Sequence, residues 1–399
     1  MKRNISAQLG TQSVWGGEEE YLMQRATQVP VVHSVAYGYD DIDTWYEVAC
    51  GDKKGHTYSR NTNPTVEVFE EKVRLLEGAE AATSFSTGMA AISNILFALL
   101  SPGDRVVSIK DTYGATNKIF LESLPRFQVD VTLCETQDHD QLEAEIAKGC
   151  QLVYLETPTN PTLKVVDVER LAQAAHRTGA VVVVDNTFAT PINQTPLEQG
   201  ADLVIHSATK FLGGHADALG GVICGSRSLV QQIYRHREIH GATLHPSSAY
   251  FLLRGMKTLH LRVRQQNESA MAVARYLEEQ PAVDSVFYPG LPTHVHHSIA
   301  AKQMKGFGGV LSFSLKGGMN AVRRLLPRLR YAHLAANLGS VETVAGPPRT
   351  TSHLECSEQE RKAMGIPEGL IRYSVGVEDI SDLLSDLEQG LKVLEEKRV

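Results

Sequence analysis

The segment ADLVIHSATKFLGGHADALGG, residues 201–221, leads from an apolar strand into a polar turn that ends on a lysine. Leu203 to Ile205 is a short run of the kind found in strands buried on both faces of a mainly parallel sheet. Ser207 and Thr209 could bind phosphate oxygens, the glycine pairs that follow let backbone approach closely, and a desolvated Lys210 could form a Schiff base. Most lysines are solvated surface residues, so this segment alone leaves a pyridoxal 5'-phosphate (PLP) site and an ordinary surface turn both open.

A second apolar strand comes just before it, in AVVVVDNTFATP, residues 180–191, and ends on Asp185. Ligands of α/β sheets bind at this carboxyl edge of the strands. Asp185 could cap the next helix, which is the commoner role, or keep the pyridinium nitrogen of PLP protonated. The 25 residues from Asp185 to Lys210 suit neighbouring strands, so both side chains can reach one pocket.

Further upstream, SFSTGMAAISNILFALL, residues 84–100, is a small-residue turn that opens a helix. Ser86 or Thr87 can cap the helix start, and the backbone N–H groups of Gly88 and Met89 could bind an anion there. An ordinary capped helix is the plainer interpretation. The patterns GxxxxGK[ST] and GxGxxG are both missing, so a nucleotide-binding function lacks its own fingerprint.

Short apolar runs alternate with helical patterns throughout residues 80–225, as at Arg105–Ile109 and Leu152–Leu155, and this predicts a βαβ architecture. The first 60 residues show little periodicity and are interpreted as an arm. From about Arg254 the pattern changes to α+β, with strands expected at residues 309–315 and 371–375 and a charged helix from Asp379.

Composition excludes several classes of protein. The formal net charge is -7 and the Lys and Arg residues form no run, so no nucleic-acid partner is expected. Neither an export signal nor a membrane span is predicted, because no apolar stretch is long enough. The five cysteines are widely spaced, which predicts reduced thiols in a cytoplasmic protein. His294, His296 and His297 follow a proline and are interpreted as a polar loop, not as a metal site.

A set of ordered motifs gives these segments a family resemblance. They are YSRNTNPT (58–65), STGMAAI (86–92), DTYG (111–114), ETPTNPT (156–162), VDNTFATP (184–191), HSATKFLGGH (206–215) and RYSVGVED (372–379). Together they resemble the PLP-dependent enzymes of Cys/Met metabolism, which include cystathionine γ-synthases, cystathionine and methionine γ-lyases, and O-acylhomoserine sulfhydrylases. The resemblance implies PLP fold type I, with a mainly parallel seven-stranded sheet and a smaller α+β C-terminal domain. It implies an arm at 1–60, a PLP-binding α/β domain at 61–255 and a C-terminal domain at 256–399.

Carried over by position, the resemblance implies that Lys210 holds PLP and moves protons, with Tyr113 stacked on the ring as a possible acid or base. Asp185 would pair with the ring nitrogen, and Asn160 would lie near the ring hydroxyl. The implied phosphate ligands are the N–H groups of Gly88 and Met89 and the hydroxyls of Ser207 and Thr209.

The remaining implied site residues come from the arm and the C-terminal domain. Tyr58 and Arg60 would reach the phosphate of a neighbouring subunit, so the family expectation is a homotetramer built from dimers with shared sites. Arg372 would bind the α-carboxylate of an amino-acid substrate, and Asn337 would contribute to substrate binding. In IRYSV, alternation places Arg372 on the strand face opposite the apolar side chains.

Departures from the family pattern bear on the substrate. Methionine γ-lyases carry a Cys where this chain has Ala115, and cystathionine-specific members usually have Glu-Ser where it has Ala336-Asn337. Arg349 and Thr351 also differ from the smaller or Met-type residues of the family. These changes favour an oxygen-linked group at the substrate Cγ, as in canavanine or an O-acylhomoserine, for γ-elimination or γ-replacement.

Three alternatives remain open at this stage. The chain could be a cystathionine γ-synthase or γ-lyase or a methionine γ-lyase, or it could act at Cβ as a cystathionine β-lyase. It could also be a non-catalytic binding protein that keeps the fold, although Lys210, Tyr113 and Arg372 are all present.

Overall fold

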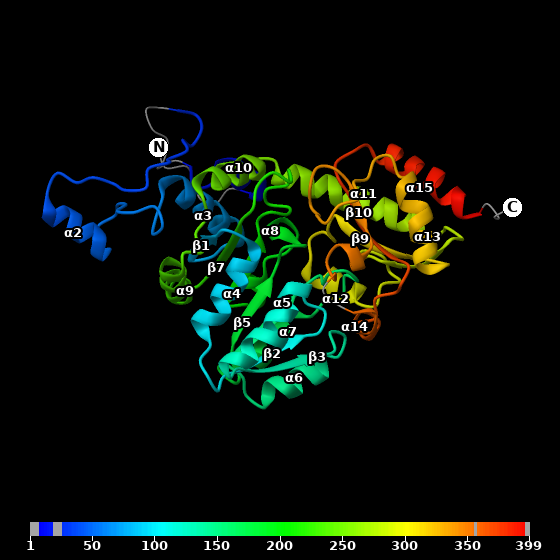
Figure 1. Cartoon of the computed structure of the whole chain (residues 1–399), viewed down its shortest axis with the longest axis horizontal. Coiled ribbons are helices and arrows are strands. Elements are labelled where there is room, and N and C mark those ends of the chain that lie inside the picture. The colour runs from blue at the N-terminus through cyan, green and yellow to red at the C-terminus, as the bar shows by residue number, and fades with distance from the viewer. Residues whose placement is uncertain (1–7, 19–25, 355–356, 396–399) are drawn as a thin grey trace.

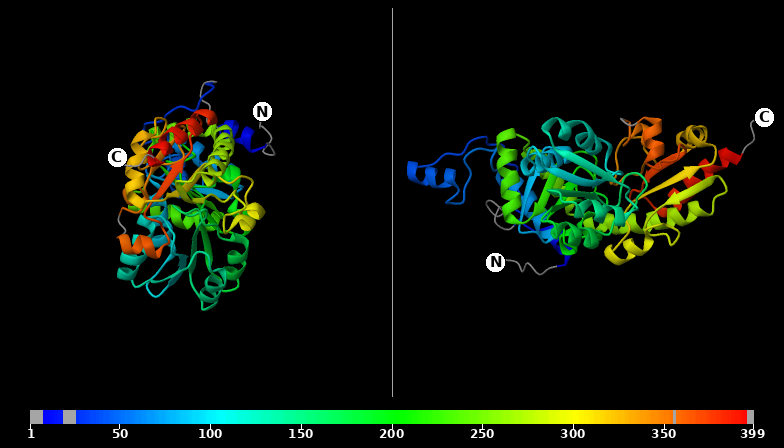
Figure 2. Two further views of the ribbon diagram at one scale, coloured as in Figure 1. Left: turned by 90° about the vertical axis from the view of Figure 1, so that its right-hand side faces the viewer. Right: turned by 90° about the horizontal axis from the view of Figure 1, so that it is seen from below.

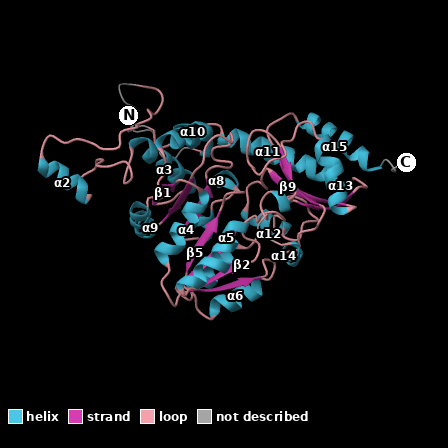
Figure 3. Ribbon diagram, in the orientation of Figure 1, coloured by secondary structure: helices cyan, strands magenta, loops and turns pink. Residues whose placement is uncertain are grey.

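The computed structural model describes residues 8–18, 26–354 and 357–395. Its largest unit is a seven-stranded sheet in the order β1-β7-β6-β5-β4-β2-β3. Figures 1 and 3 show this sheet with helices packed around it. The strands are β1 (Ala81–Phe85), β2 (Arg105–Ile109), β3 (Asp130–Cys134), β4 (Leu152–Glu156), β5 (Val181–Asp185), β6 (Leu203–Ser207) and β7 (Gly221–Gly225). Strands β2 to β6 pair in parallel, whereas β7 is antiparallel to both β1 and β6. The predicted mainly parallel sheet is therefore confirmed.

Helices cover both faces of this sheet, which explains why its strands are apolar without interruption. Val183 packs with residues of α4 (Gly88–Leu99) and α9 (Arg227–His240), whereas Val182 and Val184 pack with α6 (His139–Ala147) and α7 (Val168–His176). Successive side chains of a strand point to opposite faces, so both faces need apolar residues. Asp185 continues the Val183 side and therefore projects toward the α4 face at the carboxyl edge.

A smaller antiparallel sheet, with the strand order β10-β11-β9-β8, forms the C-terminal part of the structure. Its strands are β8 (Val283–Phe287), β9 (Val310–Leu315), β10 (Val344–Gly346) and β11 (Leu370–Ser374). It packs against α11 (Leu259–Glu278), α13 (Gly318–Leu325) and α15 (Ile380–Glu395) around a shared apolar core. The strands predicted at 309–315 and 371–375 are confirmed to within one residue at each end, and the C-terminal helix begins one residue after the predicted Asp379.

The N-terminal region is more ordered than its sequence indicated. It contains α1 (Leu9–Trp15) and α2 (Ile42–Cys50), two helices that the weak periodicity of these residues did not indicate. Asp41 caps α2 by accepting a hydrogen bond from the Thr44 N–H, and Gly51 ends the helix in the left-handed region. Helix α2 lies well away from the rest of the chain (Figures 1 and 2), and the Ile42 and Tyr46 side chains on it are 80% and 69% exposed.

The remaining helices connect and cover these units. They are α3 (Pro64–Glu77), α5 (Gly114–Lys118), α8 (Thr190–Asn193), α10 (Pro246–Met256), α12 (His297–Gln303) and α14 (Glu358–Ala363). No described helix combines the length and apolar character needed to cross a membrane. The four cysteines within the described ranges are free, and Cys356 lies outside those ranges.

Of the histidines of the predicted polar loop, His294 and His296 lie in a loop before α12 and are buried, whereas His297 is the first residue of that helix. The Nδ1 atom of His296 accepts a hydrogen bond from the Val165 N–H at 3.0 Å, and Nδ1 of His294 accepts one from the His296 N–H at 3.2 Å. Burial lowers the pKa of each imidazole to about 4, so both are neutral acceptors at pH 7. Their role is to satisfy buried backbone groups, and no metal-binding group of three or more His, Cys, Asp or Glu side chains occurs within the described ranges.

Candidate active site

A cavity of about 330 Å³ lies where the carboxyl edge of the large sheet meets the C-terminal residues. Most of the residues predicted from the sequence line it: Gly88, Met89, Tyr113, Asn160, Asp185, Ser207, Thr209, Lys210 and Arg372. They come from the ends of β4, β5 and β6, from the start of α4, and from β11. The position agrees with the general placement of ligands in open α/β sheets.

Lys210 lies in the turn that follows β6, and its amine points toward the C-terminal part of the chain. Its Nζ donates a hydrogen bond to Oδ1 of Asn337 at 2.9 Å. Burial, and next the positive charge of Arg372, lower the pKa of Lys210 to about 8. The amine is therefore neutral far more often near pH 7 than that of a surface lysine.

Asp185 is buried at the end of β5, one strand from the turn that holds Lys210. Its Oδ1 accepts the Thr187 N–H at 3.0 Å, and Oδ2 lies 3.5 Å from the Tyr154 hydroxyl. Burial raises the pKa of Asp185, and the hydrogen bonds from Thr187 oppose that rise. Asp185 does not cap the next helix, because α8 begins after Ala189 and has no side-chain cap.

The start of α4 forms a narrow cradle on one side of the cavity. A Cβ atom built on Gly88 would lie 2.8 Å from Cβ of Ser207, so only glycine fits there. Thr87 caps the helix by accepting the Ala90 N–H at 3.0 Å, and the Thr209 hydroxyl accepts the Gly220 N–H at 3.0 Å. The positive end of this helix dipole faces the cavity and favours an anion.

Arg372 is buried on β11 and extends into the cavity from the opposite side. Its Nη1 donates to Oδ1 of Asn160 at 3.2 Å, and its Nη2 donates to the backbone oxygen of Asn337 at 3.0 Å. Ile371 and Tyr373 belong instead to the C-terminal core, as the strand alternation predicted. Burial lowers the pKa of Arg372 to about 10, so the guanidinium is still charged at pH 7.

Three predicted residues do not line this cavity. Asn337 reaches it through the hydrogen bond to Lys210, and its neighbours Ala336 and Leu338 line it. Tyr58 and Arg60 lie in the N-terminal region, where the guanidinium carbon of Arg60 is 5.4 Å from the centre of the Tyr58 ring. Within one chain they take no part in the site.

Sequence reasoning missed Glu156 and Ser352, which also line the cavity. Glu156 is the last residue of β4, as Asp185 is of β5. A carboxylate at the end of an apolar strand is therefore the sequence pattern from which Glu156 could have been predicted. Burial, and next the charge of Asp185, raise the pKa of Glu156 well above its usual range. Ser352 Oγ lies 2.9 Å from Nδ1 of the buried His353, a contact that the sequence does not signal.

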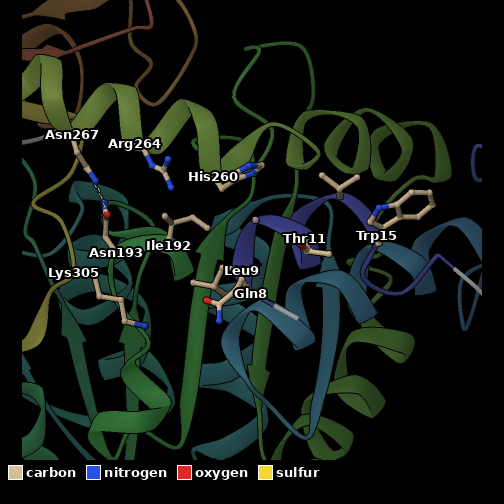
Figure 4. Close-up of a pocket in the computed structure, with 12 residues that line it drawn as sticks. Gln8, Leu9, Thr11, Trp15, Ile192, Asn193, His260, Arg264, Asn267 and Lys305 are labelled. Atoms are coloured by element: carbon tan, nitrogen blue, oxygen red, sulfur yellow. Dashed lines mark hydrogen bonds between the residues drawn. The ribbon is translucent and has the colours of Figure 1, made fainter. Parts of the chain in front are cut away.

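A second, more open groove of about 680 Å³ lies between α1 and α11 (Figure 4). His260 and Arg264 extend into it from α11, and Lys305 lies near its far end (Figure 4). No residue predicted as part of the site lines it.

Comparisons with known proteins show which family the chain is similar to. The family model described as "Cys/Met metabolism PLP-dependent enzyme" matches residues 10–392. An L-methionine gamma-lyase of Fusobacterium nucleatum subsp. polymorphum is 41% identical over 387 residues, which are 96% of this chain and 98% of the relative. Cystathionine gamma-synthase 1, chloroplastic, of Arabidopsis thaliana is 39% identical over 98% of this chain and 70% of its own length.

Among solved structures, cystathionine gamma synthase from Xanthomonas oryzae pv. oryzae, in complex with aminoacrylate and cysteine, is similar over 98% of this chain and 99% of its own. The TM-score is 0.93 and the sequence identity is 37%.

Proposed function

The chain belongs to the Cys/Met metabolism PLP-dependent enzymes, and from that premise we propose that it eliminates or replaces an oxygen-linked group at Cγ of an L-amino acid. Canavanine and the O-acylhomoserines are the substrates that carry such a group. PLP is the cofactor of this family. The observation that carries the finer proposal is the small, hydroxyl-bearing lining that Ala336, Thr351 and Ser352 give to the cavity.

The residues present fit PLP in size and in chemistry. The cradle between Gly88 and Ser207 and the positive end of α4 suit its phosphate. Asp185 is a buried acid that could pair with the ring nitrogen, and Lys210 is an amine with a lowered pKa. We therefore propose Lys210 as the attachment point, Tyr113 as the stacking residue, and Asn160 as the neighbour of the ring hydroxyl.

The proposed reaction uses groups that this chain supplies. When bound, PLP supplies an electron sink for negative charge that develops at the substrate Cα. Arg372 binds the substrate carboxylate through a charge-assisted contact and so orients the Cα–H bond. Once the substrate amine has replaced it on the cofactor, the neutral Lys210 amine would take the proton from Cα; after passing that proton on to the cofactor it would be neutral again and could take one from Cβ. Asn337 accepts a hydrogen bond from this amine at 2.9 Å and so helps to hold it in place. Loss of the Cβ proton allows the group at Cγ to leave with its bonding electrons.

The leaving group decides between the candidates. Apart from Glu156 and Asp185 near the sheet edge, the described residues that line the cavity include no carboxylate that could pair with the distal ammonium of cystathionine. The Ser352 hydroxyl, which lies 2.9 Å from Nδ1 of His353, can donate a hydrogen bond to a leaving oxygen when that Nδ1 carries the ring proton, and a thioether sulfur would use this donor less well. The Thr351 hydroxyl already donates to the Pro347 backbone oxygen at 3.1 Å.

A second candidate is methionine as substrate, because the chain is 41% identical to an L-methionine gamma-lyase. Ala115 argues against it, since it stands where the resemblance places a Cys in methionine γ-lyases.

A product assay on a panel of substrates tests the proposal. The holoenzyme is supplied with canavanine, O-acetyl- and O-succinylhomoserine, cystathionine and methionine, and kcat/KM and products are measured. We expect the highest kcat/KM for an oxygen-linked substrate, with 2-oxobutyrate, homoserine or a γ-replaced product. A higher value for methionine or cystathionine would refute the substrate class, and pyruvate as the product would move the chemistry to Cβ.

Two variants make this assay sharper. Ala336→Glu adds a carboxylate and should raise kcat/KM for cystathionine relative to canavanine, because it can pair with the distal ammonium. In the same way, Ala115→Cys introduces the Cys of methionine γ-lyases and should raise kcat/KM for methionine relative to canavanine. If neither changes the ratio of kcat/KM values, these positions do not select the substrate.

We also propose that the active unit is a dimer, with tetramers built from dimers, and that Tyr58 and Arg60 complete the site of a neighbouring subunit. The exposed apolar side chains of α2 support this, because the helix projects from the chain (Figure 1). Co-refolding Lys210→Ala with Arg60→Ala should restore activity in about a quarter of the sites, since a mixed dimer has one intact site of two. No recovery would contradict shared sites.

The domain boundaries 1–60, 61–255 and 256–399 and the cytoplasmic location stay as predictions. Limited proteolysis tests the boundaries, with cleavage expected near residues 60 and 256.

A further inference from the structure

Glu156 has both carboxyl oxygens engaged by backbone N–H groups from two different loops. Oε2 accepts the N–H of Tyr113 at 2.7 Å, and Oε1 accepts the N–H of Asn160 at 3.1 Å. Tyr113 is the residue that precedes α5, and that helix has no side-chain cap of its own. From its position at the end of β4, Glu156 thus accepts one backbone hydrogen bond from the loop that holds Tyr113 and one from the loop that holds Asn160.

Both loops carry groups that line the cavity. Tyr113 and Asn160 each line it, and Asn160 also accepts a hydrogen bond from Arg372 at 3.2 Å. Glu156 also aligns with Asp185 on the neighbouring parallel strand, so the two carboxyl groups share one face of the sheet. The buried Glu156 side chain therefore binds the backbone of Tyr113 directly and is linked to Arg372 through Asn160. It also lies beside Asp185.

We propose that Glu156 is a positioning residue that fixes Tyr113 and the Asn160–Arg372 pair relative to each other across the cavity. Through them it sets the orientation of the bound cofactor and of the substrate carboxylate. The inference rests on the proposed function of Tyr113 and Arg372, and it assigns to Glu156 a role that acts through these two residues.

A carboxylate suits this position because it is acceptor-only on both oxygens. Glutamine has nearly the same shape, but its amide nitrogen is a donor and would face one of the two N–H groups. The Glu156→Gln substitution thus breaks one contact and leaves a buried donor unpaired. Aspartate keeps both acceptors but is one methylene shorter, so it cannot hold both loops in their present positions.

The chain offers a matched control in Asp386. This buried carboxylate also accepts two backbone N–H groups, those of Arg330 and Tyr331, each at about 3.0 Å. It lies on α15 in the C-terminal part and does not line the cavity. Asp386→Asn should therefore lower the stability of the protein as Glu156→Gln does, but leave the positions of Tyr113 and Arg372 unchanged.

The test compares Glu156→Gln, Asp386→Asn and the unmodified holoenzyme. Thermal unfolding of the PLP-free proteins measures stability, and the circular dichroism of the PLP absorption band, divided by the amount bound, measures ring orientation. We expect both variants to have a lower Tm, but only Glu156→Gln to change the circular dichroism per bound PLP. It should also raise KM about tenfold, the effect of one lost hydrogen bond to a charged group.

Coupling to Tyr113 provides the second arm of the test. If Glu156 acts through Tyr113, Glu156→Gln should change the circular dichroism much less in a Tyr113→Ala background. Equal changes in both backgrounds, or circular dichroism per bound PLP that is the same in Glu156→Gln and Asp386→Asn, would overturn the proposal. Should Glu156→Gln not fold, Glu156→Asp is measured in its place.

These spectroscopic measurements need no substrate. If the proposed substrate class is wrong, the spectroscopic test of Glu156 is still valid. If the test contradicts the role of Glu156, the proposal for the substrate class is not affected.

Discussion

The lowered pKa of Lys210 leads to a quantitative prediction for the attachment of PLP to the cofactor-free protein. Only the neutral amine is nucleophilic. With a pKa of about 8, about a tenth of the Lys210 amine is neutral at pH 7, whereas the ordinary value of 10.5 would leave about one part in three thousand. The site should thus hold roughly 300-fold more neutral amine than a surface lysine at that pH.

The assay is the rate at which the visible absorption of bound PLP appears after PLP is added to the cofactor-free enzyme between pH 6.5 and 10. Because the folded-state pKa is lowered, the rate should rise about tenfold per pH unit below pH 8 and level off above it. A lysine analogue treated with PLP in the same buffers provides the control for titration of PLP itself.

A rate that keeps rising tenfold per unit up to pH 10 would refute the reasoning. Burial is the first cause of the lowered pKa and the charge of Arg372 is the second. Arg372→Met should therefore move the midpoint to higher pH without restoring the value of a surface lysine. An unchanged midpoint would show that Arg372 does not influence Lys210.

Three further predictions follow from single contacts. Lys210→Ala should be colourless after gel filtration in buffer without PLP, because covalent attachment of the cofactor is lost. If the visible absorption band of PLP is retained, PLP is attached to another residue. Asn337→Ser removes the Oδ1 acceptor 2.9 Å from Nζ of Lys210 and should lower kcat about tenfold or less, with Tm nearly unchanged; a fall in Tm with no change in kcat would contradict the role given to this contact. Phe313→Ala in the fully buried C-terminal core should cost about 3–5 kcal/mol in urea unfolding, and a cost below about 1 kcal/mol would mean that the core repacks.

The sequence predicted the large sheet and the meeting of Asp185 with Lys210 because both depend on local patterns. Apolar runs bounded by turns mark strands buried on both faces, and parallel strands end at the same edge. The strand predicted at Arg105–Ile109 has those bounds in the structure. The sequence offered Ser86 or Thr87 as the cap of α4, and in the structure Thr87 has that role.

What the sequence did not predict depends on contacts between distant residues. The hydrogen bond from Lys210 to Asn337 crosses 127 positions of sequence, and no local pattern encodes it. Burial of His294 and His296 depends on how their loop packs against residues such as Val165. The helix α2 was missed because it is only 9 residues long and Val48 is the one residue that it buries, so packing against the rest of the chain does not mark it.

The hydrogen bond between Arg372 and Asn160 spans 212 positions, which has a consequence for synthesis of the protein. At the usual rate of translation, about 5–20 residues per second, the ribosome needs about 10–40 s to proceed from Asn160 to Arg372. All strands of the large sheet are complete long before that, since the last of them ends at Gly225. A nascent chain can therefore complete the strands that carry Asp185 and Lys210 while it still lacks Arg372, the residue proposed to bind the substrate carboxylate.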